Sequence, residues 1–244
     1  MQLSQLETLL DAWQKNLCQE VGLAELISRN ETAHKWKVTY CSIVLREAII
    51  WRFVDLMSQV AYLLKQKHIL GSRLLIRSAI ETLGILIYLN QKTEAVIEER
   101  ISFWQFIEVT NRLMFGSKNQ FTELESINIL TVLNKCEERY PGIVDIYNSL
   151  SESAHPNFDG VCMGYSKVDK VNYKTEFKNR WVELFDSSQL ALIENCLKTM
   201  EEEYNQHWPK TYEKLEKWLV QNNEILELEK TTTSRSTSSL CAPH

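Results

Sequence analysis

The segment most informative about the fold is SRLLIRSAIETLGILIYL, residues 72–89. A helix built from it is apolar on nearly every side, which is typical of a central helix surrounded by neighbouring helices. Glycine and proline are scarce, with seven and four among 244 residues, so the chain has long windows in which helices can form. We therefore predict an all-α fold, a single multi-helix bundle with an up-and-down core and extra N- and C-terminal helices.

Apolar residues recur at helical spacing on both sides of this stretch. The spacing predicts a long helix over about 31–67, with Gly71 and Ser72 as the turn that follows it. Thr93 precedes acidic residues and is expected to cap the N-terminus of the next helix. Asp186 or Ser187 is expected to cap a later one.

The domain organisation follows from length and composition. With 44% apolar residues, a chain of this length can bury a core in one large domain or two small ones. We expect a single helical domain over 1–229, with its core at about 31–207. The polar, Ser/Thr-rich segment 230–244 is predicted to be disordered.

Charge and cysteine usage limit the classes of function. The net charge of −5 provides no global attraction to nucleic acid or anionic lipid. The six cysteines lack zinc-ligand spacing, so we interpret them as reduced thiols and expect neither a metal ion nor a cofactor. No apolar run of 18 residues occurs and the N-terminus does not resemble a signal peptide, so we expect a cytoplasmic location without a membrane partner.

The central stretch also carries polar residues. Arg73, Arg77 and Glu81 are spaced four residues apart and form one stripe on an otherwise apolar helix. A charged group in a helix bundle is costly to bury unless it is paired. We therefore expect the stripe to be paired within itself or with a neighbouring helix.

A short helix over about 142–154 provides the candidate partners. It is followed by His155, and the ring of Pro156 pushes this residue out of the α region, so we expect the helix to end there. The residues that share one face of this helix are Tyr147, Ser151, and Glu152 or His155. We predict that this face meets the arginine stripe.

Two motifs, RSAIETLGILIYL (77–89) and YNSLSESAHPN (147–157), together resemble the paired signatures of an uncharacterised bacterial all-α family. In that family an R-S-x-x-E helix precedes an L-S-E-x-x-H-P helix end, and the resemblance covers about 35–205. The family is loosely grouped with HEPN-like helical bundles, some of which are metal-independent ribonucleases in toxin and anti-phage systems. The resemblance implies a HEPN-like core, and it marks Arg77, Ser78, Glu81, Ser151, Glu152, His155 and Pro156.

HEPN ribonucleases carry an arginine followed about four to six residues later by a histidine, commonly as R-N-x-x-x-H. Arg77 and His155 do not have this spacing. RNETAH, residues 29–34, does have it, although it lies earlier in the chain than that motif is expected. Arg29 and His34 are therefore either a HEPN motif or a chance match.

Ribonuclease chemistry requires a base, an acid and a cation on the phosphate. His155 could be base or acid, because an imidazole titrates near neutral pH. Arg77 would hold the phosphate in a bidentate manner, with Glu81 orienting it. Ser151 would orient the imidazole or donate to a phosphate oxygen, and a homodimer could bring two such sets together.

A second candidate surface for RNA is basic. Lys167, Lys170, Lys174 and Lys178 recur every three or four residues, so in a helix they would share one face and contact phosphates. The alternative is an ordinary solvated surface, and we interpret the acidic run Glu201–Glu203 in that way as well. Tyr147, Glu152 and Arg73 complete the candidate binding residues.

Two hypotheses remain open. The protein is either a HEPN-like ribonuclease or nucleic-acid-acting effector that uses Arg77, Glu81, Ser151 and His155, or a non-catalytic helical module. In the second case it binds a protein partner or itself, and the same residues form a buried structural clasp. Solvent access discriminates between them, because an active site opens to a cleft whereas a clasp is sealed and fully hydrogen-bonded.

Overall fold

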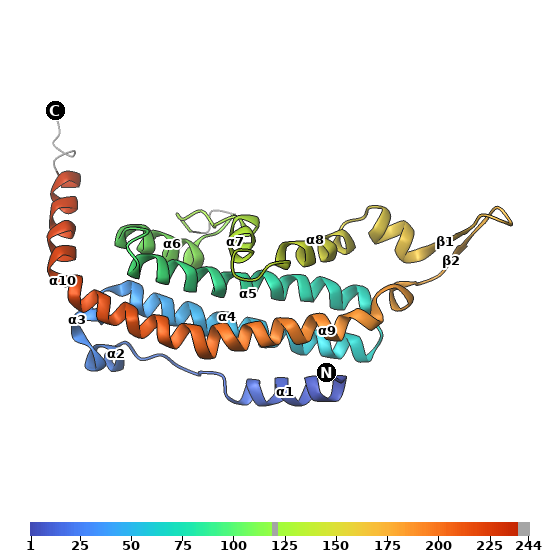
Figure 1. The fold of residues 1–244 in the computed structure, drawn as a ribbon, viewed down its shortest axis with the longest axis horizontal. Helices are drawn as coiled ribbons and strands as arrows, with labels where there is room; N and C mark the ends of the chain where they lie inside the picture. Colours follow the sequence, from blue (N-terminus) through green and yellow to red (C-terminus); the bar gives the residue numbers. More distant parts are fainter. Residues whose placement is uncertain (119–121, 239–244) are drawn as a thin grey trace. The chain divides into compact units, whose positions relative to one another are not determined.

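The computed structural model describes residues 1–118 and 122–238, with side chains as far as Thr231, and it is all-α apart from one small hairpin (Figure 1). This confirms the predicted fold class. The elements in chain order are α1 (Leu3–Lys15), α2 (Leu23–Arg29), α3 (Glu31–His34), α4 (Lys37–Lys65), α5 (Ile69–Ile97), α6 (Phe103–Phe115), α7 (Ile129–Cys136), α8 (Ile143–Ala154), η1 (Phe158–Met163), β1 (Ser166–Asp169), β2 (Lys174–Phe177), α9 (Trp181–Glu201), η2 (Glu202–His207) and α10 (Trp208–Ser238).

The chain divides into two compact units, here called unit one and unit two. Unit one comprises residues 1–19, 46–88 and 127–205, and unit two comprises 20–45, 89–126 and 206–244. Helices α4 and α5 each contribute residues to both. That the chain folds as one domain stays a prediction.

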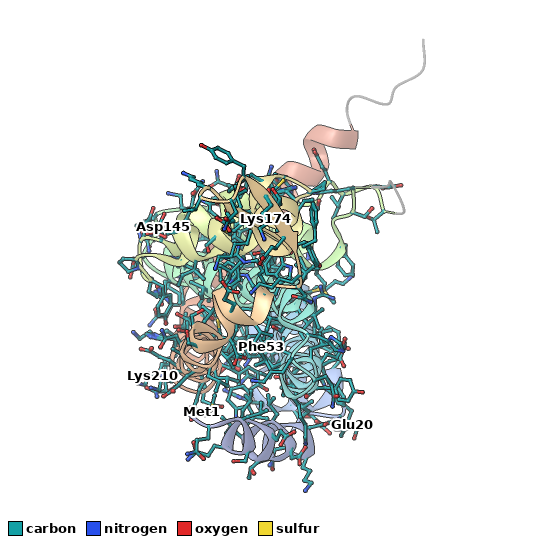
Figure 2. The ribbon with its side chains drawn as sticks, turned by 90° about the vertical axis from the view of Figure 1, so that its right-hand side faces the viewer. Met1, Glu20, Phe53, Asp145, Lys174 and Lys210 are labelled. Carbon is teal, nitrogen blue, oxygen red and sulfur yellow. The ribbon has the colours of Figure 1, made fainter. Side chains whose placement is uncertain are left out.

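The core of unit one forms where apolar positions of its helices point inward. Figure 2 shows Phe53 among the helices and Asp145 at the outer edge, in agreement with the complete burial of Phe53 and the exposure of Asp145. The fully buried large side chains of this unit include Leu6, Phe53, Met57, Ile76, Ile80 and Trp181. The stretch 72–89 is therefore central in this unit as far as Tyr88.

The core of unit two is rich in aromatic rings. Trp36 meets Phe103 edge to face, with 5.2 Å between ring centroids, and Phe103 lies 5.9 Å from Trp218. Such pairs stabilise a core beyond their buried area. Leu219 and Phe106 are fully buried in the same unit.

The turn predicted at Gly71 and Ser72 is wrong, because α5 already begins at Ile69 and includes both residues. The chain reverses one turn earlier, at Lys67, which adopts a left-handed backbone with φ of 57°. The His68 N–H then donates to the Leu63 carbonyl, 2.8 Å away, and ends α4. Lys67 therefore takes the left-handed conformation at the end of α4 that glycine usually adopts, and the sequence pattern does not indicate this helix end.

The helix start predicted at Thr93 is also wrong. Thr93 is buried inside α5, where its hydroxyl donates to the Leu89 carbonyl at 2.8 Å. A threonine can satisfy its hydroxyl in this way within a helix, so it need not be a cap. The next helix starts at Phe103, where Ser102 and Gln105 form a capping box.

Other predicted boundaries shift for similar reasons. The helix expected over 31–67 is divided into α3 and α4, and the side chain of Asn30 caps α3 by accepting from the Ala33 N–H at 3.0 Å. Asp186 lies inside α9, which begins at Trp181, so the cap predicted at Asp186 or Ser187 is wrong. The predicted end of the short helix at His155 is confirmed, because α8 stops at Ala154.

The segment after α8 contains the hairpin. Strands β1 and β2 are antiparallel and pair Ser166 with Phe177 and Asp169 with Lys174. The condition for a helical stripe of the four lysines is therefore not met, because β-strand geometry places Lys167 and Lys174 on a common face and Lys170 lies in the turn.

The C-terminal segment predicted to be disordered, 230–244, is helical in α10 as far as Ser238, and residues 239–244 lie outside the described part. Cys241 belongs to that undescribed end, and the other five cysteines are free thiols. Among the helices described, none combines the length and the apolar character that a membrane crossing requires.

Candidate functional site

The arginine stripe of α5 meets α8 in unit one, but of the face predicted on α8 only Tyr147 makes this contact. The Tyr147 hydroxyl lies between the two charged groups of α5, because it accepts from Arg77 Nη2 at 2.8 Å and donates to Glu81 Oε1 at 3.0 Å. Arg77 Nη2 and Glu81 Oε1 are themselves 3.5 Å apart. Tyr147 is buried, so α8 fixes the ion pair of α5 from inside the unit.

Arg73 lies one helical turn earlier on α5 and is more deeply buried. Its Nε donates to Ser153 Oγ at 2.7 Å, its Nη2 donates to the Ser149 carbonyl at 3.0 Å, and its guanidinium lies 4.0 Å from the ring centre of Phe185. Burial lowers the pKa of Arg73. Ser149 and Ser153 belong to the last turns of α8, where the helix dipole favours a cation, and Phe185 belongs to α9. We call Arg73, Arg77, Glu81, Tyr147, Ser149 and Ser153 the α5–α8 clasp.

The remaining predicted catalytic residues do not join the clasp. Ser151 donates to the Tyr147 carbonyl of its own helix at 2.8 Å. Glu152 is exposed and accepts from Asn157. The imidazole of His155 is exposed and forms no hydrogen bond with any residue that the structure describes.

The backbone explains the position of His155. This residue ends α8 in an extended conformation, with φ of −87° and ψ of 141°, as expected before proline. Asn157 then accepts from the Gly160 N–H at 3.0 Å and starts η1. A Cβ on Gly160 would lie 2.0 Å from the His155 carbonyl oxygen, so the chain folds back here through close backbone contact. His155 thus ends an element and leaves its ring in solvent.

Solvent access to the α5–α8 clasp is intermediate. The side chains of Arg77 and Glu81 are 30% and 29% exposed, whereas Arg73, Tyr147 and Ser153 are buried. The buried Nε of Arg77 has no hydrogen-bond partner among the described residues. The clasp is therefore sealed at Arg73 and reaches solvent at Arg77.

The R-N-x-x-x-H motif forms a second polar cluster, in unit two. Arg29 Nη2 and His34 Nε2 contact the two oxygens of one carboxylate, Glu216, at 2.6 and 2.8 Å. A carboxylate only accepts, so Nε2 is the donor, and Nδ1 lies 3.0 Å from Thr39 Oγ1. His34 is 2% exposed, so both ring nitrogens are used inside the fold. No spacing in the sequence connects Glu216 of α10 with this motif.

Sequence reasoning missed a third cluster, in unit one. Glu203, assigned above to a solvated face, is fully buried and accepts from Tyr140 Oη at 2.8 Å and from Arg139 Nη1 at 3.1 Å. Burial, and then the charge of Glu203, raise the pKa of Tyr140, which keeps the hydroxyl neutral and donating. Arg139 and Tyr140 also line a pocket of about 260 Å³ with apolar walls that include Ile80 and Leu192.

The basic candidates Lys167, Lys170 and Lys174 are exposed on the hairpin. Apolar side chains of the same hairpin are exposed too: Val168, Val171, Tyr173 and Phe177. Lys178, at the end of β2, pairs with Glu183 at 3.1 Å. The hairpin therefore mixes lysines with apolar groups and is not a uniform basic face.

The described residues contain no group of three or more His, Cys, Asp or Glu side chains arranged to hold a metal ion. Chemically, the α5–α8 clasp can hold two helices together and can offer Arg77 to an anion at the surface. Comparison of the chain with protein-family models, with curated proteins and with solved structures finds no match.

Proposed function

We propose that the protein is a non-catalytic helical module that binds a macromolecular partner in the cytoplasm, and that the α5–α8 clasp is structural. The observation that carries this proposal is the Tyr147 hydroxyl, which uses Arg77 and Glu81 for contacts within the fold. His155, the general acid or base that catalysis would need, stands apart in solvent without a hydrogen bond to any described residue.

The hairpin supports a binding role. Its apolar side chains are exposed, with Tyr173 at 94% and Phe177 at 83%. Exposed apolar groups gathered on one element mark interaction surfaces more often than isolated ones do. In Figure 1 the hairpin extends beyond the ends of α8 and α9, the neighbouring helices of unit one, so a partner could reach it.

The test combines thermodynamic and enzymatic measurements on four proteins: wild type, Tyr147→Phe, Arg77→Ala and His155→Ala. We expect Tyr147→Phe to lower the free energy of unfolding by about 1–3 kcal/mol, because it removes the hydroxyl that bonds to both part-buried charged groups, Arg77 and Glu81. Arg77→Ala should be destabilising as well. His155→Ala, the matched surface control, should unfold as wild type does, and no variant should cleave single- or double-stranded RNA.

A ribonuclease of the HEPN-like kind is the second candidate, and the partial exposure of Arg77 and Glu81 favours it. On that hypothesis Arg77 would bind phosphate and His155 would transfer a proton. Cleavage of RNA by the wild type that is lost in His155→Ala, with urea unfolding unchanged, would replace our proposal with this one.

A further inference from the structure

The hairpin has one charged face and one apolar face. Side chains alternate along each strand, so the register places Lys167 opposite Glu176 and Asp169 opposite Lys174 on one face. The other face carries Ser166, Val168, Thr175 and Phe177. Opposite charges are therefore neighbours across the strands on the charged face, whereas the apolar face has no covering element among the described residues.

The root of the hairpin is firmly anchored to unit one. Arg180 Nη1 donates to the carbonyls of Met163 and Ser166, at 3.1 and 2.8 Å. The buried ring of Trp181 lies so close to Gly164 that an added Cβ would be 2.8 Å from three of its atoms. The strands therefore project from a fixed base, although a two-stranded hairpin alone is only marginally stable.

Hydrogen bonding distinguishes the two edges of the hairpin. The Lys178 N–H donates to the Tyr165 carbonyl at 3.0 Å, which sets the alternation of the ladder. Counted from this pair, the backbone groups of Ser166 and Val168 point outward from β1, and those of Thr175 and Phe177 point outward from β2. On the β1 edge, the Ser166 carbonyl already accepts a hydrogen bond from Arg180. The backbone groups of Thr175 and Phe177 meet no residue that the structure describes beyond the hairpin.

We propose that β2 pairs, antiparallel, with β2 of a second copy of this chain about a two-fold axis through Thr175. This names the partner of the proposed binding module and so rests on that proposed function. Within β2, the sequence Lys174-Thr175-Glu176 is symmetric in its charges about Thr175, whereas Tyr173 lies in the turn, with φ of 53°. The axis places Lys174 opposite Glu176 of the second copy. A two-fold interface requires such self-complementarity.

Charge also excludes the neighbouring registers. A slip of the axis by one full residue, to Glu176 or to Lys174, places two glutamates or two lysines directly opposite each other. A slip by half a residue turns apolar side chains of one copy toward the charged face of the other. Only the axis through Thr175 joins opposite charges and keeps both apolar faces on the same side of a four-stranded sheet. The exposed backbone edge of β2 is thereby covered.

The test measures self-association of the full chain by sedimentation velocity over a range of concentrations. Lys174→Glu creates two acidic residues on the edge and Glu176→Lys creates two basic ones, so each variant places like charges across the axis. We expect each alone to dimerise about tenfold more weakly than wild type. An equal mixture of the two variants should associate more tightly than either variant alone, because every pair across the axis is then of opposite charge.

A backbone variant provides independent evidence. Thr175→Pro removes an N–H that points away from β1, so it should abolish dimerisation while the hairpin persists. Val168→Pro is the matched control, because it removes an outward N–H from the other edge and should leave the dimer intact. The inference is overturned if wild type stays monomeric, if mixing the charge variants restores nothing, or if both proline variants weaken association equally.

The two proposals fail separately. If the wild type is strictly monomeric and does not cleave RNA, and if His155→Ala is as stable as the wild type, the second copy is ruled out as the partner. The proposal of a binding module is then unaffected. RNA cleavage that requires His155 would remove the binding module as the main function. If the monomer binds RNA and this binding depends on the hairpin, the result would count against pairing of β2 with a second copy.

Discussion

At the scale of single residues, buried charged groups are paired with residues distant in sequence. Glu203 is fully buried, and its described partners Arg139 and Tyr140 lie more than sixty residues earlier, at separations of 64 and 63. It lies in η2, three residues after the buried Met200 and seven after the buried Cys196, so it continues the buried face of α9. The acidic run looks solvated in the sequence because nothing near it in the chain indicates that Arg139 and Tyr140 pair with Glu203.

We expect Arg139→Ala to lower the free energy of unfolding by about 3–5 kcal/mol, because it leaves the carboxylate of Glu203 buried without its cation. Tyr140→Phe should cost less, about 1–3 kcal/mol, since one hydrogen bond is lost. Urea denaturation measures both. Lys135→Ala is the control on the exposed ion pair with Glu138 and should change stability by less than about 1 kcal/mol. Equal effects of Arg139→Ala and Lys135→Ala would show that Glu203 does not depend on Arg139.

At the scale of elements, the start of α8 is stabilised by an acid from the end of α7. Glu137 accepts from the N–H groups of Gly142 and Val144, at 2.6 and 3.0 Å. These backbone hydrogen bonds lower the pKa of Glu137 from its ordinary value of 4.5. Because the folded pKa is the lower one, the stabilisation is complete above pH 4.5 and is lost as pH falls through the folded pKa.

The difference in melting temperature between wild type and Glu137→Gln should therefore be largest near neutral pH and shrink as pH falls below 4.5. Scanning calorimetry at a series of pH values measures it. Asp145→Asn removes a carboxylate from the first turn of α8 that accepts no hydrogen bond from a described residue, so it serves as control. A difference for Glu137→Gln that stays constant down to pH 3 would contradict this assignment.

At the scale of the whole molecule, α4 and α5 run through both compact units. Unfolding either unit would interrupt two long helices of the other, so we expect both units to unfold in one transition. Calorimetric and van't Hoff enthalpies of thermal unfolding should then agree. Two resolved transitions, with Arg139→Ala lowering only one of them, would instead indicate two domains.

The sequence predicted much of the candidate site and less of its partners. Arg73, Arg77, Glu81 and Tyr147 follow from helical spacing, because polar residues on an apolar helix must find partners on a neighbour. Ser149 and Ser153 were missed, since hydroxyls on a short helix give no signal of their own. His155 was placed correctly at a helix end, but its side chain lies in solvent because the end of an element fixes the backbone and leaves the ring free.

The all-α class, the central position of residues 72–89 and the end of α8 before Pro156 could be predicted from local sequence patterns. These features depend on local periodicity and on proline geometry, which act within a few residues. The contacts of Glu216 with Arg29 and His34, and the burial of Glu203, became evident only in the fold. They depend on contacts between segments far apart in the chain, and no local sequence pattern specifies which distant group makes them.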